Sequence, residues 1–218
     1  MTSGMKTVGD RQTNSTDQHT LIPSRLVLFD FDGTITEKDT LLEFVRFYCG
    51  RTRYYVGLAM LAPVMFLFAA RLIENWKAKQ YFLARFFKGE NLSHFNSRCI
   101  EFTRTILPSL VRPAALDAIL KYQKENATVV VVSASAENWV KPWCDQLGLI
   151  CLATRLEVRG AYLTGMLDGP NCHGDEKVCR IRERFDLTAF DDVIAYGDSR
   201  GDEAMLKLAH QRFYKPFR

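Results

Sequence analysis

The sequence predicts an α/β fold in which an open parallel β-sheet receives a large helical insertion after its first strand. Three short apolar runs, residues 26–31, 128–133 and 192–198, each end in polar or acidic residues. This pattern is typical of buried parallel strands that carry functional side chains at their carboxyl ends. Residues 39–112 lack β-branched runs and are expected to form several helices instead.

The elements between the strands complete a Rossmann-like core. Residues 113–125 begin with a proline, which suits the first turn of a helix, and residues 137–147 predict a second helix. Residues 155–158 and 161–165 flank an Arg-Gly pair and predict a β-hairpin.

A chain of 218 residues can hold one domain that carries a sizeable insertion. We expect residues 1–20 to be a flexible leader, because they are polar and lack the apolar stretch of a secretion signal. The α/β core is then expected at residues 21–38 and 113–218, and the helical cap at residues 39–112.

Charge is distributed unevenly. Residues 40–112 carry a net charge of +7, whereas the chain as a whole carries +4. A basic middle segment beside an acidic remainder suits an anionic substrate or surface near a metal-binding carboxylate site. Basic residues alternate with aromatics at 79–88, but an amphipathic cap helix explains this better than nucleic-acid binding, so no nucleic acid is expected as a partner.

The segment from Tyr54 to Ala70 contains no charged residue and is interrupted by Pro63. Its length is at the lower limit for crossing a bilayer. It is interpreted either as a buried or amphipathic cap helix, or as a segment that makes peripheral contact with a membrane. A spanning helix is disfavoured, because the flanking elements must return to one active site.

Six cysteines are scattered without the spacing of common zinc sites. Cys172, His173 and Cys179 lie close together, but two thiols and one imidazole at irregular spacing are a poor ligand set. Reduced thiols in a cytosolic protein are the simpler interpretation.

Four groups of residues indicate phosphoryl-transfer chemistry. Asp30 and Asp32 stand two apart at a strand end, before Gly33. A carboxylate nucleophile such as Asp30 can form an acyl-phosphate, while Asp32 protonates the leaving oxygen and later activates water. Ser133 and Lys177 are expected to bind phosphoryl oxygens, with Gly33 and Ala134 beside them.

The expected cofactor is Mg²⁺, which prefers oxygen ligands. Asp30, the backbone carbonyl of Asp32, and Asp198 would hold the ion, and Asp202 would bind it directly or through a water.

These residues resemble the four motifs of the haloacid dehalogenase superfamily, from about residue 26 to residue 217. The helical insertion directly after the first motif looks like the phosphoserine phosphatase-like branch, and the acid at Asp32 favours phosphatases. Ala134-Ser135 and Gly201 stand where phosphoserine phosphatases usually carry Gly-Gly and Asn. The apolar cap and residues 171–177 are similar, more loosely, to a subgroup that includes phosphatidylglycerophosphate phosphatases.

The resemblance implies a Mg²⁺-dependent phosphomonoester hydrolase that acts through an aspartyl-phosphate on Asp30. Three alternatives stay open: a membrane-associated lipid-phosphate phosphatase, a phosphotransferase that passes the phosphoryl group to an alcohol, and a non-catalytic protein that binds a phosphate ligand. The expected location is the cytoplasm, in part at the inner face of the membrane.

Overall fold

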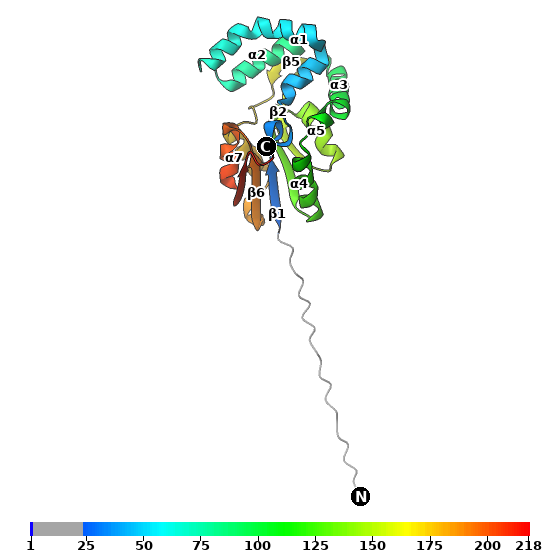
Figure 1. Ribbon diagram of the computed structural model, residues 1–218, viewed down its shortest axis with the longest axis vertical. Helices are drawn as coiled ribbons and strands as arrows, with labels where there is room; N and C mark the ends of the chain where they lie inside the picture. Colours follow the sequence, from blue (N-terminus) through cyan, green and yellow to red (C-terminus); the bar gives the residue numbers. More distant parts are fainter. Residues whose placement is uncertain (2–23) are drawn as a thin grey trace.

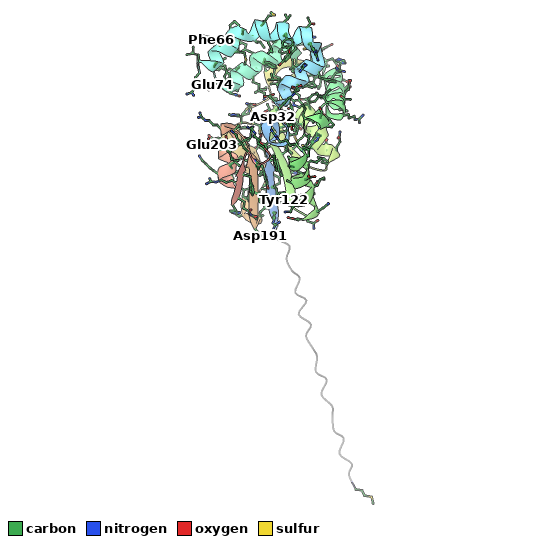
Figure 2. All side chains as sticks on the ribbon, viewed as in Figure 1. Asp32, Phe66, Glu74, Tyr122, Asp191 and Glu203 are labelled. Atoms are coloured by element: carbon green, nitrogen blue, oxygen red, sulfur yellow. The ribbon has the colours of Figure 1, made fainter. Side chains whose placement is uncertain are left out.

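A computed structural model describes residue 1 and residues 24–218 of the chain (Figure 1). The expected leader, residues 1–20, therefore lies outside the described residues apart from Met1. The described chain forms an α/β core and, above it in Figure 1, a helical cap. Asp32 lies where the two meet (Figure 2).

The core contains one five-stranded sheet whose strands are all parallel, in the order β3-β2-β1-β6-β7. The strands are β1 (Arg25–Phe29), β2 (Thr128–Ala136), β3 (Ile150–Thr154), β6 (Asp192–Gly197) and β7 (Gln211–Tyr214). The predicted fold class and its three central strands are confirmed. The two edge strands were not predicted, because β3 is short and half-buried and β7 is exposed along its length.

Alternate residues of the central strands enter two separate apolar cores, one on each face of the sheet. Leu26 and Leu28 belong to one core, and Val27 and Phe29 belong to the other. Because both faces are covered, the strands read as continuous apolar runs rather than as an alternating pattern. This double burial fixes the register of β1, and therefore where its carboxyl end opens into the site.

Four helices cover the sheet. They are α4 (Pro113–Lys124), α5 (Glu137–Gln146), α6 (Asp175–Arg184) and α7 (Glu203–Leu208). The first two match the predicted helices. Helix α6 has seven charged residues among ten and buries only Lys177 and Ile181, so it offers little apolar periodicity by which to recognise it.

The cap follows β1 and consists of three helices and a short turn: α1 (Thr40–Ala69), α2 (Asn75–Phe87), α3 (Leu92–Thr105) and η2 (Leu107–Ser109). Asp39 caps α1 by accepting hydrogen bonds from the backbone N–H groups of Leu41 and Leu42. Gly50 has non-helical dihedrals (φ 77°, ψ 167°) and divides α1 into two segments. The first segment packs into the molecule, and the second extends over α2.

The predicted hairpin is present as β4 (Leu156–Arg159) and β5 (Tyr162–Leu167). It packs on α2 rather than on the sheet. Leu163 exchanges backbone hydrogen bonds with the α2–α3 connection, from Gly89 N to Leu163 O at 2.8 Å and from Leu163 N to Glu90 O at 2.9 Å. Gly165 permits this approach, because a Cβ there would lie 2.4 Å from the Cα of Ala84. The cap therefore includes residues from the segment 113–218.

The first segment of α1 is anchored by Phe44, which is fully buried. Its ring lies 4.9 Å from that of Trp139 on α5 and 5.3 Å from that of Phe102 on α3. Phe44 therefore joins the cap to the core through aromatic contacts.

We expect Phe44→Ala to lower the free energy of unfolding by about 3–5 kcal/mol, since it opens a cavity among well-packed rings. Tyr81→Ala on α2, where the side chain is 57% exposed, should change stability by no more than about 0.5 kcal/mol. Urea unfolding of both variants measures the difference, and equal losses would contradict the anchoring role of Phe44.

Candidate active site

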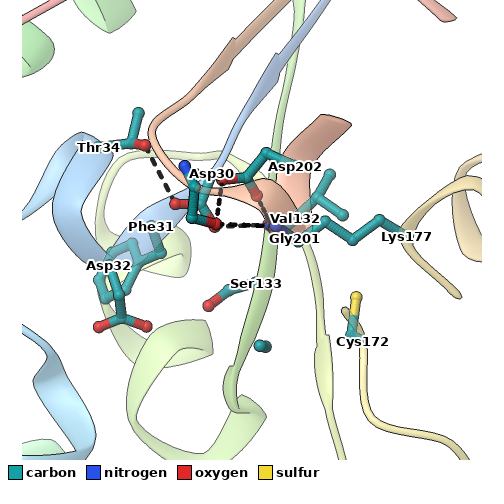
Figure 3. Close-up of polar contacts among 12 residues, drawn as sticks. Asp30, Phe31, Asp32, Thr34, Val132, Ser133, Cys172, Lys177, Gly201 and Asp202 are labelled. Carbon is teal, nitrogen blue, oxygen red and sulfur yellow. Dashed lines mark hydrogen bonds and ion pairs between the residues drawn. The ribbon is translucent and has the colours of Figure 1, made fainter. Parts of the chain in front are cut away.

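The candidate residues meet at the carboxyl edge of the sheet. Asp30 directly follows β1, Ser133 lies on β2 and Asp198 directly follows β6, and these strands are neighbours. Lys177 reaches the same point from α6 (Figure 3). Residues separated by up to 168 positions in sequence are thus brought together by parallel strand pairing.

Lys177 is buried and makes three hydrogen bonds. Its Nζ donates to Asp30 Oδ1 at 2.6 Å, to Asp202 Oδ1 at 2.7 Å and to the carbonyl of Val132 at 2.8 Å (Figure 3). Burial alone would lower the pKa of Lys177, but the two carboxylates outweigh burial and hold the pKa above its ordinary value. The ammonium group therefore stays charged although it is buried.

Burial has a larger effect on the pKa of Asp30 than the positive charge of Lys177 beside it. Burial raises the pKa of Asp30 to about 7, although Lys177 acts in the opposite direction. The hydroxyl of Thr34 donates to Asp30 Oδ2 at 3.0 Å. A further positive charge beside Asp30 would lower its pKa and favour the ionised carboxylate.

Asp202 holds the turn that carries Asp198. Its Oδ2 accepts hydrogen bonds from the backbone N–H of Asp198 (3.1 Å) and of Ser199 (2.9 Å), and from the Ser199 hydroxyl (2.8 Å). Burial opposes ionisation of Asp202, but Lys177 and these donors lower its pKa below the ordinary value. One oxygen of Asp202 thus binds Lys177, and the other fixes the backbone at Asp198.

Asp30, Asp198 and Asp202 form a cluster whose carboxylate oxygens lie within 4.8 Å of one another. Three hard oxygen donors at this spacing suit a divalent cation such as Mg²⁺. These are the three expected ligands that would bind through a carboxylate; the ligand expected from Asp32 is its backbone carbonyl. Asp198 also forms an ion pair with Arg218.

Gly33 makes this cluster sterically feasible. It adopts a left-handed conformation (φ +81°), and a Cβ there would lie 2.4 Å from Asp198 Oδ2. The turn at Phe31–Ile35 therefore brings its backbone against the acidic cluster.

The carboxylate of Asp32 is held separately from the cluster. Its Oδ1 accepts from the backbone N–H and the hydroxyl of Thr40, both at 2.6 Å, and its Oδ2 accepts from the Ser135 hydroxyl at 2.6 Å. Thr40 begins α1 and Ser135 lies on β2. Asp32 is thus connected to both the cap and the core, and its carboxylate is directed away from Asp30 (Figure 3).

Ser133 is fully buried, and its hydroxyl accepts a hydrogen bond from the backbone N–H of Ser135 at 2.9 Å. The neighbouring Ala134 carbonyl accepts from Lys79 of α2 and from Thr154. Sequence reasoning missed Ser135 and Lys79. Ser133 and Ser135 are two residues apart on one strand, so the sequence could have indicated that Ser135 is near the site. Lys79 lies in a cap helix, and no local sequence pattern indicates that it reaches the site.

A cavity of about 690 Å³ joins these groups. Its floor carries Asp30, Asp32, Lys177, Asp198 and Asp202 from the core, and polar side chains such as Lys79 and Asn171 stand beside them. The wall from the cap is mostly apolar and comprises Leu41, Leu42, Tyr54, Leu58, Met65, Phe68, Ala78 and Phe82. The site therefore combines a charged base with an apolar upper wall.

Cys172, His173 and Cys179 do not make a zinc site. The thiol of Cys172 is buried and directed to the carbonyl of Leu152 at 3.7 Å, whereas Cys179 is exposed. Within the described part of the chain, the three aspartates are the group of potential ligands at metal-binding distance.

Comparison with known proteins agrees with this geometry. Residues 27–207 match the family described as haloacid dehalogenase-like hydrolase. The chain is 35% identical to Protein CicA of Caulobacter vibrioides (strain NA1000 / CB15N), over 88% of this chain and 86% of that protein. It is 29% identical to a probable phosphatase of Mycobacterium tuberculosis (strain H37Rv), over 87% of this chain and 68% of that protein.

Solved structures share the fold at low sequence identity. A Bordetella pertussis Tohama I protein of unknown function superimposes with a TM-score of 0.76 at 20% identity, covering 87% of this chain and 89% of that one. A phosphoserine phosphatase described as a phospho-aspartyl intermediate analogue gives 0.59 at 22% identity, covering 87% and 85%.

The raised pKa of Asp30, about 7 against an ordinary value of 3.8, predicts a pH-dependent stability when EDTA removes divalent cations. The folded state then holds a proton that the unfolded state has released, so the free energy of unfolding should fall as pH rises from about 4 to about 7. Urea unfolding at several pH values measures this decline. Asp30→Asn should make the decline clearly smaller, leaving the part due to Asp39, whose pKa burial raises to about 6. Asp117→Asn, on the exposed face of α4, should leave it unchanged. A full decline in Asp30→Asn would contradict burial of Asp30 as a cause.

Proposed function

Because the chain belongs to the haloacid dehalogenase-like hydrolases and is a phosphatase, we propose that it hydrolyses phosphomonoesters with Asp30 as nucleophile and Mg²⁺ as cofactor. The observation that carries this proposal is the buried contact between Asp30 and Lys177 at 2.6 Å, at the base of a cavity lined by Asp198 and Asp202. We propose a cytoplasmic location, with access to the inner face of the membrane.

Asp30 suits the role of nucleophile because its carboxylate is held at the end of a rigid strand. Thr34 and Lys177 orient its two oxygens. A carboxylate oxygen attacks phosphorus, the bond from phosphorus to the leaving oxygen breaks, and an aspartyl-phosphate remains. Water then attacks that phosphorus, which releases inorganic phosphate and restores the carboxylate.

Asp32 suits the role of general acid and base. It lines the same cavity as Asp30 while its oxygens are oriented by Thr40 and Ser135. It would give a proton to the leaving oxygen in the first step and take one from the attacking water in the second. Since Thr40 belongs to the cap, the position of the cap would influence this proton transfer.

The phosphoryl group carries negative charge that the site must offset. We assign Ser133, Lys177, Gly33 and Ala134 to phosphate binding, with Lys177 supplying a buried positive charge next to the nucleophile. Mg²⁺ would be held by Asp30, Asp198 and the backbone carbonyl of Asp32, with Asp202 as a direct or water-mediated ligand, and supplies further charge neutralisation when bound.

Two alternatives share this site. A phosphotransferase would use the same aspartyl-phosphate with an alcohol in place of water, and a non-catalytic protein would bind the phosphate without turning it over. Product analysis separates the first, because a phosphotransferase yields a phosphorylated alcohol when glycerol is added. Release of inorganic phosphate excludes the second alternative, because a non-catalytic protein would not hydrolyse the ester.

We expect Asp30→Asn to lower kcat for p-nitrophenyl phosphate by at least about 10³-fold, because an amide cannot form the acyl-phosphate. Asp117→Asn is the matched control and should keep wild-type activity. Excess EDTA should abolish wild-type turnover and MgCl₂ should restore it. Undiminished turnover by Asp30→Asn would refute the mechanism.

The apolar wall of the cavity favours a second candidate, a phosphatase for lipid phosphates. Leu58, Met65 and Phe82 are better suited to a hydrocarbon chain than to the charged amine and carboxylate of an amino acid. The departures at Ala134-Ser135 and Gly201 agree with a substrate other than phosphoserine. The loose similarity of the apolar cap and residues 171–177 to phosphatidylglycerophosphate phosphatases belongs to this proposal.

The lipid-phosphate candidate can be tested with short alkyl phosphates, which do not form micelles, by varying the length of the alkyl group. We expect n-hexyl phosphate to exceed ethyl phosphate in kcat/KM by about tenfold or more, since each buried methylene contributes up to about 0.8 kcal/mol. Leu58→Asp should reduce this ratio without a similar loss on ethyl phosphate. Equal rates on both esters, or a preference for phosphoserine, would argue against the lipid assignment.

A further inference from the structure

The outer face of the cap carries a large apolar surface, which we call the cap tip. It lies on the second segment of α1, the turn after it and the start of α2. Its exposed apolar side chains are Tyr55, Val56, Met60, Met65, Phe66, Leu67, Leu72 and Trp76. Phe66 is 71% exposed and Leu72 is 70% exposed. Eight exposed apolar side chains on one end of the cap indicate an interaction site rather than ordinary solvent-facing surface.

The opposite side of the same helix packs against α2 and lines the active-site cavity. Gly57 and Leu61 are buried toward α2, and a Cβ at Gly57 would lie 2.4 Å from the ring of Phe86. Tyr54 and Leu58 line the cavity. The helix thus uses one side to close the site, while apolar side chains on its outer side have no cover within the described part of the chain.

Positive charge flanks this apolar face. Residues 51–88 contain seven basic side chains and a single acidic one, Glu74. Of these, Lys79 faces the active-site cavity, and Arg53 and Lys77 pair with Glu90 and Glu74. Arg51 and Arg71 are exposed at the two ends of the uncharged run, and neither has a carboxylate within 4.0 Å among the described residues. An apolar face between cations is complementary to a bilayer that contains anionic lipids.

We infer that the cap tip docks on the surface of an anionic lipid bilayer. The apolar side chains insert among the acyl chains, and Arg51 and Arg71 contact the phosphate groups of the lipids.

The packing favours a helix that lies in the interface over one that spans the membrane. Residues 51–69 would extend about 28 Å, close to the thickness of the hydrocarbon core. However, Phe44 anchors the preceding segment among buried rings, and α2, which carries the exposed Lys77 and also Arg85, lies alongside the helix. A spanning orientation would remove these cations from water.

The cap tip is continuous with the mouth of the active-site cavity. Met65 is 45% exposed and also lines that cavity. Phe66 and Glu74 mark the end of the cap that overhangs the core (Figure 2). Docking would therefore bring the cavity next to the lipid headgroups. This consequence rests on the proposed function, whereas docking itself does not.

The full chain, mixed with sedimentable vesicles of phosphatidylcholine alone or with an equal amount of phosphatidylglycerol, tests the inference. We expect the wild type to sediment with the anionic vesicles, weakly with the neutral ones, and less in high salt. Phe66→Ser/Leu72→Ser should lower the partition coefficient about tenfold or more. Arg51→Gln/Arg71→Gln should lower it by at least about tenfold on anionic vesicles.

Matched variants elsewhere on the surface separate docking from a general loss of stability. Ile100→Ser/Leu120→Ser removes exposed apolar side chains from α3 and α4, and Arg182→Gln/Arg184→Gln removes exposed cations from α6. Both should bind vesicles as the wild type does. All four double variants should hydrolyse p-nitrophenyl phosphate at the wild-type rate without vesicles, which confirms that they are folded.

Several outcomes would overturn the inference. Equal binding to neutral and anionic vesicles would refute an anionic surface, and an absence of binding to either would refute docking. A dimer that Phe66→Ser/Leu72→Ser dissociates, together with no vesicle binding, would assign the cap tip to a second copy of the chain. A wild type that binds anionic vesicles but does not hydrolyse phosphomonoesters would leave docking standing and refute the proposed function instead.

Discussion

The rest of the site depends on one buried ammonium group, Lys177, placed between the carboxylates of Asp30 and Asp202. Without this cation, two acids with little solvent contact would repel one another, and one would take up a proton. Lys177 also donates to the carbonyl of Val132, so a single side chain joins α6 to the end of β1, to the middle of β2 and to the turn after β6. The opposing charges hold these elements in register because removing any one leaves its partners buried and uncompensated.

Asp32 extends this network from the core into the cap. Its oxygens bind Thr40 at the start of α1 and Ser135 on β2, and the indole N–H of Trp139 donates to the Thr40 hydroxyl at 3.1 Å. The candidate acid is therefore oriented by both parts of the molecule. Lys79 makes a second polar connection, from α2 to Asn171 at 2.9 Å. The cap is thus more than a cover for the site, because its position helps to set the geometry of the proposed proton donor.

The cap combines two apolar surfaces with different partners. Its inner wall faces the charged base of the cavity, where the proposed function places the group esterified to the phosphate. Its outer face, around Phe66, is exposed, and Arg51 and Arg71 are exposed at the two ends of the uncharged run. Burying either surface against hydrocarbon removes apolar side chains from water, which is energetically favourable. One amphiphilic environment, a lipid surface with phosphate headgroups, matches the inner and the outer surface together.

The sequence by itself determined the α/β fold class and the three central strands that Asp30, Ser133 and Asp198 end or follow, because parallel strands buried on both faces read as apolar runs with polar residues at their ends. It indicated Lys177 and Asp202 through the order of the motifs and not through a strand pattern. It also located the uncharged run of α1. It did not decide whether this run is buried, because burial depends on neighbours that are remote in sequence. Only the tertiary structure decided that β4 and β5 cover α2, that Ser135 and Thr40 orient Asp32, and that the outer face around Phe66 stays exposed. The edge strands β3 and β7 escaped prediction for the same reason, since pairing with a neighbouring strand, and not local pattern, makes them part of the sheet.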